Sequence, residues 1–481
     1  MSEQQSLKSK TLKGTVWSAI DSFSSQAIQF VLGILLARIL APSDYGVIGM
    51  LAIFLAVSQS IIDSGFGNAL IQKKDRNQID YSTVFYFNII IGVIIYIILF
   101  VAAPLIASFY NMPILTNVTR VLALNLIVNS LMIVQNTKLT IELNFKILTK
   151  IRFCSNLISG FIALSLAYLG YGVWALVFQS VIAQLLSCLF LWIFAKWKPS
   201  LCFSKASFLS LFSFGSKLLI TGLYGPIFNN LNTLIIGKFF TANALGFYTR
   251  AYHFAQFPSF NISQIISRVS YPVLSSIQDD NQKLCHGYRL LIKNTYFVVF
   301  PCMLGLACMA EPIILLLLTD KWIGCVSLLQ ILCISLVFYP LISYNINLLL
   351  VKGQSGLHLK LDFIKKIISI IILIVSIKFG IKGICYGMVI TTLFSWLITA
   401  FYSGKLIGLT LTKQLSDLLP SFICSIIMVS AIFPISLISL SVYFVIPLQI
   451  LMGIVIYTIS SSFLNKECLK TIKSMKYDAI K

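Results

Sequence analysis

Residues 82–108 read STVFYFNIIIGVIIYIILFVAAPLIAS, a stretch without a single charged side chain. An α-helix rises about 1.5 Å per residue, so a stretch of this length can cross the roughly 30 Å hydrocarbon core of a bilayer. Comparable apolar stretches follow one another along the whole chain. Of its 481 residues, 58% are hydrophobic and 11% are charged, which leaves too little polar surface for a soluble protein of this size. The sequence therefore predicts an all-α integral membrane protein.

We predict about fourteen membrane-spanning helices from these stretches. Six of them form an N-terminal lobe at residues 1–205, and six more form a C-terminal lobe at 206–405. Residues 406–481 hold helices 13 and 14 and a basic cytoplasmic tail. The predicted segments cover about residues 15–37, 46–69, 82–108, 118–137, 153–171, 173–195, 211–237, 247–270, 294–318, 324–350, 361–380, 383–403, 417–438 and 441–463.

Lysine and arginine are distributed unequally between alternate loops. With the N-terminus in the cytoplasm, 29 of the 36 basic residues fall on the cytoplasmic side and 7 on the other. Cytoplasmic loops of membrane proteins are enriched in basic residues, so we expect both termini to be cytoplasmic. The net charge of +21 is then expected to fix topology and attract membrane lipids rather than nucleic acid. The seven on the other side are Arg38, Arg120, Lys238, Arg250, Lys321, Lys378 and Lys382.

The sequence contains no pattern typical of an enzyme. The eleven cysteines include no CxxC pair, and the three histidines lack metal-ligand spacing. We find no Walker sequence and no nucleophile elbow. We therefore expect a transporter with no catalytic residue, no metal site and no bound cofactor, driven by a gradient of H⁺ or Na⁺.

The two predicted lobes show a weak internal repeat. A shift of 200 residues aligns Arg38-Ile39-Leu40-Ala41 with Lys238-Phe239-Phe240-Thr241, and Gly46 with Gly246. Because each block has an even number of helices, the two blocks share one orientation and are related by an axis along the membrane normal. Parallel repeats of this kind occur in secondary transporters, where the substrate path lies between the halves.

Several short motifs resemble a known family. They include LARILAPSDYG at 36–46, DSGFGNALIQKKD at 63–75, KWKPSLCFS at 196–204 and IIGKFFTANALGFYTRAYHF at 235–254. Their order is similar to that in the polysaccharide-exporter branch of the multidrug/oligosaccharidyl-lipid/polysaccharide (MOP) flippase superfamily. The resemblance covers roughly residues 14–350, and the later helices agree in number rather than in sequence.

The resemblance implies a fold like that of multidrug (MATE) transporters, with two six-helix lobes around a central cavity. It also implies the substrate, an undecaprenyl-pyrophosphate-linked oligosaccharide that is moved from the cytoplasmic to the periplasmic leaflet of a bacterial inner membrane. Such units are used for O-antigen, capsule or exopolysaccharide. The expected partners are a polysaccharide polymerase and glycosyltransferases, and a self-contained cavity favours a monomer.

A pyrophosphate and a sugar chain need cations and hydrogen-bonding groups inside the membrane, where an unpaired charge costs several kcal/mol. The segment at 247–270 places Arg250, Asn261 and Arg268 on one helix face, because steps of 11 and 18 residues nearly complete whole turns. A second polar stripe follows the segment at 211–237. Packing between helices is the alternative interpretation of both stripes. The candidate substrate-binding residues are Lys217, Tyr224, Asn229, Asn232, Arg250, Asn261, Gln264 and Arg268.

Four charged residues form a candidate gate near the cytoplasmic helix ends. Asp21 and Asp63 lie in the first two segments, and Lys217 and Arg268 lie in the repeat-equivalent segments seven and eight. We predict that the four form a charge latch between the lobes, because paired charges escape much of the cost of burial. The alternative is that these side chains extend to the lipid headgroups. Asp21 or Asp63 is the expected proton carrier, and a sodium site in the segment at 211–237 is equally compatible.

Two other functions remain open from the sequence. One is a cation-coupled exporter of small molecules such as drugs, built on the same fold. The other is a membrane scaffold that holds the enzymes of glycan assembly together.

Overall fold

A computed structural model describes residue 17 and residues 24–63, 65–436, 441–466 and 468–469. All regular secondary structure in this part of the chain is helical, as the sequence predicts. The chain divides into two compact units, Met1–Gly246 and Phe247–Lys481. The lobe boundaries that we place after residues 205 and 405 stay predictions.

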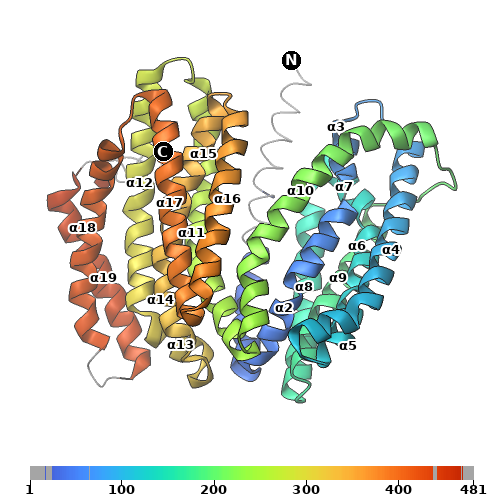
Figure 1. Cartoon of the computed structure of the whole chain (residues 1–481), viewed down its shortest axis with the longest axis horizontal. Helices are drawn as coiled ribbons and strands as arrows, with labels where there is room; N and C mark the ends of the chain where they lie inside the picture. Colours follow the sequence, from blue (N-terminus) through green and yellow to red (C-terminus); the bar gives the residue numbers. More distant parts are fainter. Residues whose placement is uncertain (1–16, 18–23, 64, 437–440, 467, 470–481) are drawn as a thin grey trace. The chain divides into compact units, whose positions relative to one another are not determined.

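The first unit contains an apolar helix at Ser24–Ile39 and nine further helices. The helix α10 lies along α2, and α8 packs against α9 (Figure 1). The bounds are α2 (Pro42–Asp63), α3 (Phe66–Gln72), α4 (Gln78–Tyr110), α5 (Ile114–Leu122), α6 (Leu124–Ser130), α7 (Ile133–Ile141), α8 (Phe145–Tyr168), α9 (Val173–Phe194) and α10 (Lys205–Phe239).

The second unit begins at Phe247, inside α11. The first five residues of that helix belong to the first unit. In this unit α12 packs against α18, α18 against α19, and α16 against α17 (Figure 1). The bounds are α11 (Ala242–Ser276), α12 (Asn281–Cys308), α13 (Ala310–Leu318), the short 3₁₀ helix η1 (Asp320–Trp322), α14 (Cys325–Leu336), α15 (Tyr339–Val351), α16 (Ser355–Ile377), α17 (Gly380–Ile407), α18 (Leu411–Ser436) and α19 (Val442–Leu464).

Within the described residues, nine helices are long and apolar enough to cross a membrane, or ten if one bent pair counts as a single span. In the described residues all fourteen predicted segments overlap helices, so this result is compatible with the predicted count without confirming it. The segment at 118–137 is not one straight helix, because Ile114–Ser130 and Ile133–Ile141 meet at an angle of 42°. Ser130 lies at the break and donates its hydroxyl to the carbonyl of Ile127, a local bond of the kind that often bends helices.

Helix starts are fixed by side chains that accept hydrogen bonds from free backbone N–H groups. A capping box of Asn77 and Asp80 begins α4, and Ser204 caps α10. Asp280 caps α12 by accepting bonds from the N–H groups of Gln282 and Lys283. As a result, α4, α10 and α12 begin within a few residues of polar stretches of the sequence.

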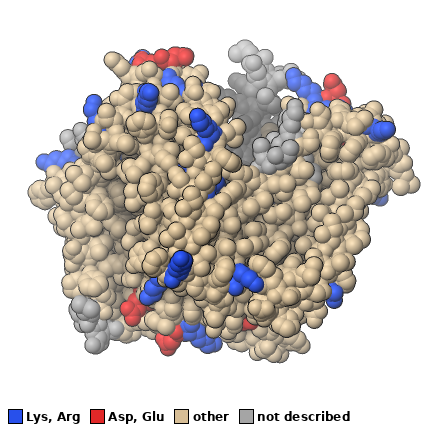
Figure 2. All heavy atoms as spheres, in the orientation of Figure 1, with Lys and Arg blue, Asp and Glu red and all other residues tan. Residues whose placement is uncertain are grey.

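The predicted alternation of basic loops agrees with the geometry of the first unit. At the start of α4, Gln78 donates to the carbonyl of Lys198, so two loops of the basic side meet there. At the other end of α4, Arg120 lies over the ring of Phe100 and Lys238 over that of Phe109. These two cations belong to the sparsely charged side. On the face shown in Figure 2, most charged side chains lie toward helix ends, and uncharged side chains cover the middle.

The apolar core of the first unit gathers beside the starts of α4 and α10. Phe66, Phe85 and Trp197 pack together there with buried aliphatic side chains. In the second unit the largest fully buried side chains are aromatic, among them Trp322 and Tyr296. Many large apolar side chains along the helices are exposed instead, as expected for helices that face lipid.

Candidate functional site

A polar network crosses the first unit between α2, α6 and α9. Asp63, at the end of α2, accepts hydrogen bonds on Oδ1 from Gln59 Nε2 at 3.0 Å and from Asn129 Nδ2 at 3.3 Å. Gln184 of α9 donates to Asn129 Oδ1 at 3.3 Å. Asp63 forms no ion pair with another described residue, so neutral amides are its partners.

A second hydrogen bond joins α6 to α9 one helical turn away. Asn125 precedes Asn129 by four residues on α6, and Ser180 precedes Gln184 by four on α9. Asn125 Nδ2 donates to Ser180 Oγ at 2.9 Å. The spacing of four residues places the two asparagines on one face of α6, and Ser180 and Gln184 on one face of α9. Two hydrogen bonds, one turn apart, therefore join α6 to α9.

This network has the chemical properties of a site for a cation or for sugar hydroxyls. A carboxylate offers oxygen ligands to a proton or to Na⁺, and amides offer both donors and acceptors. Asp63 is exposed at the surface of its unit rather than sealed in the core. The site can therefore exchange ligands without unfolding of the unit.

The helices α2 and α10 run antiparallel beside this network. A Cβ atom added to Gly237 would lie 3.0 Å from Met50, and one added to Gly222 would lie 3.2 Å from the hydroxyl of Ser60. The later residue of α10 thus faces the earlier residue of α2. The position of Lys217, five residues before Gly222, is consequently level with the end of α2 near Asp63.

The gate residues are only partly covered by the structure. Asp21 lies outside the described residues, and so do the side chains of Lys217 and Arg268. Asp63 is described, with the amide partners given above. The charge latch therefore stays a prediction.

The remaining candidate residues of α10 lie on a helix that continues through Pro226. The rings of Tyr224 and Phe228 pack with their centroids 4.6 Å apart. Asn229 is exposed and Asn232 is half-buried. The neighbouring Asn230, which we did not select, donates to the carbonyl of Pro226 at 2.8 Å.

The candidate residues of α11 also lie on one continuous helix, because Pro258 and Pro272 do not end it. Arg250 is half-buried and Gln264 is exposed. Asn261 donates its amide to the carbonyl of Phe257, in its own helix, at 2.8 Å. Their role in substrate binding stays a prediction.

The buried side chain of Asp80 joins the start of α4 to the end of α3 and to the start of α10. The Asp80 side chain is 2% exposed and accepts a bond from Lys73 Nζ at 2.6 Å. It also accepts a bond from the hydroxyl of Ser207 on α10. Nearby, Trp197 Nε1 donates to Gln78 Oε1 at 2.8 Å. The motifs at 63–75 and 196–204 are far apart in sequence, and these contacts bring them together.

The second unit has its own membrane-embedded polar contacts. Asn345 Oδ1 accepts bonds from the hydroxyls of Tyr288 and Ser403, which joins α15 to α12 and α17. At one end of the unit Arg289 binds Asp417 through two bonds of 2.7 and 2.8 Å. These interactions tie the helices to one another, which is the structural role that polar residues often have in membrane proteins.

The sequence did contain a signal for the residues that we missed. Asn125 and Asn129, and likewise Ser180 and Gln184, are polar pairs at a spacing of four in apolar segments. The same spacing of four separates Gln59 from Asp63. Asp80 gives no such signal, because an acidic residue at the start of a helix is common and its buried partners come from distant loops.

Comparison with known proteins identifies the family. A family model described as polysaccharide biosynthesis protein matches residues 35–327, which is more than half of the chain. This chain belongs to the polysaccharide biosynthesis protein family. The predicted resemblance to a polysaccharide family is thereby confirmed, and the four motifs of the sequence analysis lie within the matched range.

Two relatives of this family member cover most of its length. The teichuronic acid biosynthesis protein TuaB of Bacillus subtilis (strain 168) is 26% identical over 436 residues, which is 90% of each chain. A membrane protein of Klebsiella pneumoniae, described as lying in the cps region, is 30% identical over 410 residues and 83% of each chain.

A solved structure shows the same fold. The lipid II flippase MurJ, in an inward closed conformation, matches with a TM-score of 0.77 and 17% identity, over 95% of this chain and all of the other. The predicted all-α membrane fold is confirmed by this likeness.

Proposed function

We propose that this family member is a flippase that carries a lipid-linked oligosaccharide across the membrane. The observation that carries the proposal is the match of the polysaccharide biosynthesis family over residues 35–327 of a multi-pass helical chain. The relatives named above support it, because one is named for teichuronic acid biosynthesis and the other lies in a cps region.

The proposed substrate is an undecaprenyl-pyrophosphate-linked repeat unit, and the proposed direction is from the cytoplasmic to the periplasmic leaflet. The lipid tail stays in hydrocarbon, while the sugars and the pyrophosphate need a polar path. Lys217, Arg250 and Arg268 are the proposed partners of the pyrophosphate. The amides on α10 and α11 are the proposed partners of the sugars, and they are Asn229, Asn232, Asn261 and Gln264, with the Tyr224 hydroxyl beside them.

Asp63 is the residue that we propose for ion coupling. Its partners are the neutral amides of Gln59 and Asn129, so its carboxylate is available to bind H⁺ or Na⁺. A cation at this carboxylate competes with the amide donor of Asn129, which also accepts a bond from Gln184, and this connects the ion site to the packing of α6 and α9. Asp21 is the second proposed acid, and no catalytic role is proposed for any residue.

A deletion strain tests the function directly. Cells that lack the protein should lose surface polysaccharide and accumulate lipid-linked repeat units that face the cytoplasm. Expression of the natural chain should restore export, and an Asp63→Asn variant at equal abundance should restore at least ten-fold less. Normal surface polysaccharide in the deletion strain, with no other exporter active, would remove the proposal.

Topology and partners complete the proposal. We propose the bacterial inner membrane as the location, both termini in the cytoplasm, and a monomer that works beside a polymerase and glycosyltransferases. Labelling of a single cysteine at residue 2 or at residue 480, in a variant whose eleven natural cysteines are replaced by serine, checks the two termini. Labelling of either by a membrane-impermeant reagent in intact spheroplasts would contradict the topology.

A further inference from the structure

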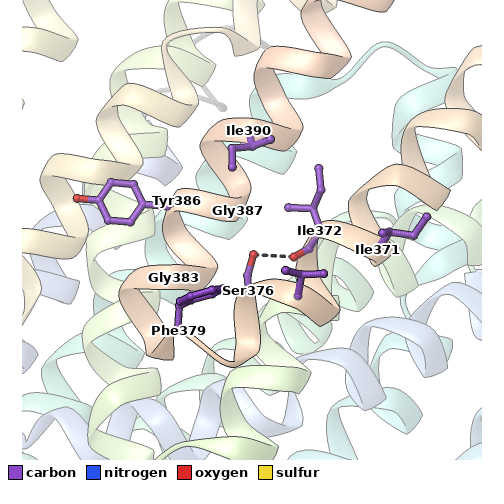
Figure 3. Close-up of a pocket in the computed structure, with 9 residues that line it drawn as sticks. Ile371, Ile372, Ser376, Phe379, Gly383, Tyr386, Gly387 and Ile390 are labelled. Atoms are coloured by element: carbon purple, nitrogen blue, oxygen red, sulfur yellow. Dashed lines mark hydrogen bonds between the residues drawn. The ribbon is translucent and has the colours of Figure 1, made fainter.

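An open groove runs between α16 and α17 of the second unit, with a volume of about 420 Å³ (Figure 3). Its walls are large apolar side chains of both helices, including Ile371 and Val375 on α16 and Tyr386 and Ile390 on α17. These four side chains are each about half exposed, so the groove opens on the outer surface of the unit. No role is assigned to this groove by the function proposed above.

Two glycines of α17 form the floor of the groove. A Cβ atom at Gly387 would overlap the hydroxyl of Ser376, and one at Gly383 would overlap the side chain of Phe379. The helices therefore approach closely, and the bulky residues on either side of the glycines stand as walls. The Ser376 hydroxyl donates to the carbonyl of Ile372 at 2.6 Å, as the dashed line in Figure 3 marks. The surface of the groove is consequently apolar.

One end of the groove carries two positive charges. Lys378 follows the last residue of α16, and Lys382 lies on α17 one turn before Tyr386, so both belong to the end near Phe379. Both lysines are exposed, and neither forms an ion pair with a described residue. At this end, an apolar channel thus opens beside an uncompensated cationic pair.

The groove extends through most of the hydrocarbon depth of one leaflet of a bilayer. Along α17 it extends from Gly383 to Ile390, seven residue steps or about 10 Å, whereas half of the hydrocarbon core is about 15 Å. Lys378 and Lys382 belong to the sparsely charged side of the predicted topology, so the headgroup end faces the outer leaflet. Basic sites between membrane helices are a known mode of anionic lipid binding.

We propose that this groove binds one acyl chain of an anionic phospholipid, with the lipid phosphate held by Lys378 and Lys382. The occupant is a bilayer lipid of the phosphatidylglycerol type rather than the transported polyprenyl lipid. The apolar groove binds the acyl chain, and the two lysines bind the negatively charged headgroup. The inference does not depend on the proposed transport function.

Lipid titration of the purified full-length protein tests the site. Delipidated protein is titrated with phosphatidylglycerol, or with phosphatidylcholine of the same acyl chains, and bound lipids are counted by native mass spectrometry. We expect one saturable phosphatidylglycerol site. Neutralising each lysine should weaken it about five-fold, because a basic residue near lipid headgroups contributes about that factor. The double variant Lys378→Gln/Lys382→Gln should therefore weaken binding roughly 25-fold.

Matched variants separate the site from general lipid association. Lys360→Gln changes a lysine near the opposite end of α16 and should leave the affinity unchanged. Val375→Trp fills the groove and should abolish the site. Ile374→Trp places the same ring at the preceding residue, which is 61% exposed and lies outside the groove. This variant should keep the site.

Three results would overturn the assignment. Equal binding of phosphatidylcholine with no effect of the lysine variants would remove the headgroup contact. Equal binding by the Val375→Trp and Ile374→Trp variants, both with the natural thermal stability, would remove the acyl-chain groove. Displacement of phosphatidylglycerol from this site by a polyprenyl phosphate at lower concentration would make the transported lipid class the occupant instead.

Discussion

Gly46 and Gly246 stand 200 positions apart in the sequence, and each lies against the backbone at the start of the other's helix. A Cβ atom at Gly46 would overlap the carbonyl of Ala242, and one at Gly246 would overlap the carbonyl of Pro42. The contact is reciprocal, since Pro42 and Ala242 are also 200 positions apart. All four residues belong to the first unit. This is the pattern that a local two-fold axis produces.

The reciprocal contact gives the weak sequence repeat a physical cause. A shift of 200 aligns Gly46 with Gly246, and both positions need the absence of a side chain for the same reason. The starts of α2 and α11 approach so closely that only glycine fits at the crossing.

Alanine at either glycine is therefore expected to be costly. Gly46→Ala and Gly246→Ala should each lower the free energy of unfolding by about 1–3 kcal/mol, because the methyl group forces the backbones apart. The double variant should cost less than the sum, because both substitutions open one crossing. Thermal unfolding of the purified protein measures this. Gly356→Ala, with no atom within 4 Å of the added Cβ, is the control.

The ion pair of Lys73 and Asp80 should stabilise the first unit. Asp80→Asn leaves the ammonium of Lys73 without its charged partner and should lower the free energy of unfolding by about 1–3 kcal/mol. Asp75→Asn alters an exposed acid in the neighbouring loop and should change stability by no more than about 0.5 kcal/mol. Equal melting temperatures for the two variants would contradict the assigned role of Asp80.

Arg289 should stabilise the second unit through geometry as well as charge. Arg289→Lys keeps the positive charge but loses one of two parallel bonds to Asp417, whose side chain is 4% exposed. We expect a loss of about 1.5–3 kcal/mol in the free energy of unfolding. Lys283→Gln breaks the exposed pair with Asp280 and should change stability much less, because solvent screens an exposed pair. A lysine variant as stable as the natural protein would show that the bidentate contact contributes little.

Asn129 should matter for transport in a way that Asn125 does not. Asn129→Ala removes a hydrogen bond to the Asp63 carboxylate, and a bond to a charged group contributes about 1.5–3 kcal/mol. If this bond is used during transport, the export rate should fall at least ten-fold. Asn125→Ala lies one turn away on the same helix and removes only the bond to Ser180. The measurement is the export rate of the two variants at equal protein abundance. Equal rates would contradict a role in transport for the hydrogen bond from Asn129 to Asp63.

The elements of the fold follow closely from the sequence, because membrane helices are specified by local hydrophobicity. The stretch at 82–108 lies within α4, and the described residues of the other predicted segments are mostly helical, although four of these segments divide into two or more helices. The bend after Ser130 was not predicted, since it depends on local hydrogen bonds within a segment that is apolar throughout.

The contacts within the site were harder to predict than the helices. The spacing of four places Gln59 and Asp63 on one helix face, and the two side chains are hydrogen-bonded at 3.0 Å. The partners Asn129 and Gln184 come from helices 66 and 121 positions further along the chain, and periodicity within one helix carries no information about which helices are neighbours. The family motifs include Trp197, but they do not indicate its partner. The structure shows that Trp197 donates a hydrogen bond to Gln78.

Transfer of a lipid-linked oligosaccharide in reconstituted vesicles tests the central claim most directly. The purified protein is placed in liposomes that carry a fluorescent oligosaccharide on a polyprenyl pyrophosphate, and an impermeant enzyme that cleaves the exposed sugar reports its movement between leaflets. We predict rapid transfer with the natural protein and an imposed H⁺ or Na⁺ gradient, and at least ten-fold slower transfer with folded Asp63→Asn. Transfer no faster than in protein-free liposomes, under either gradient, would contradict the account.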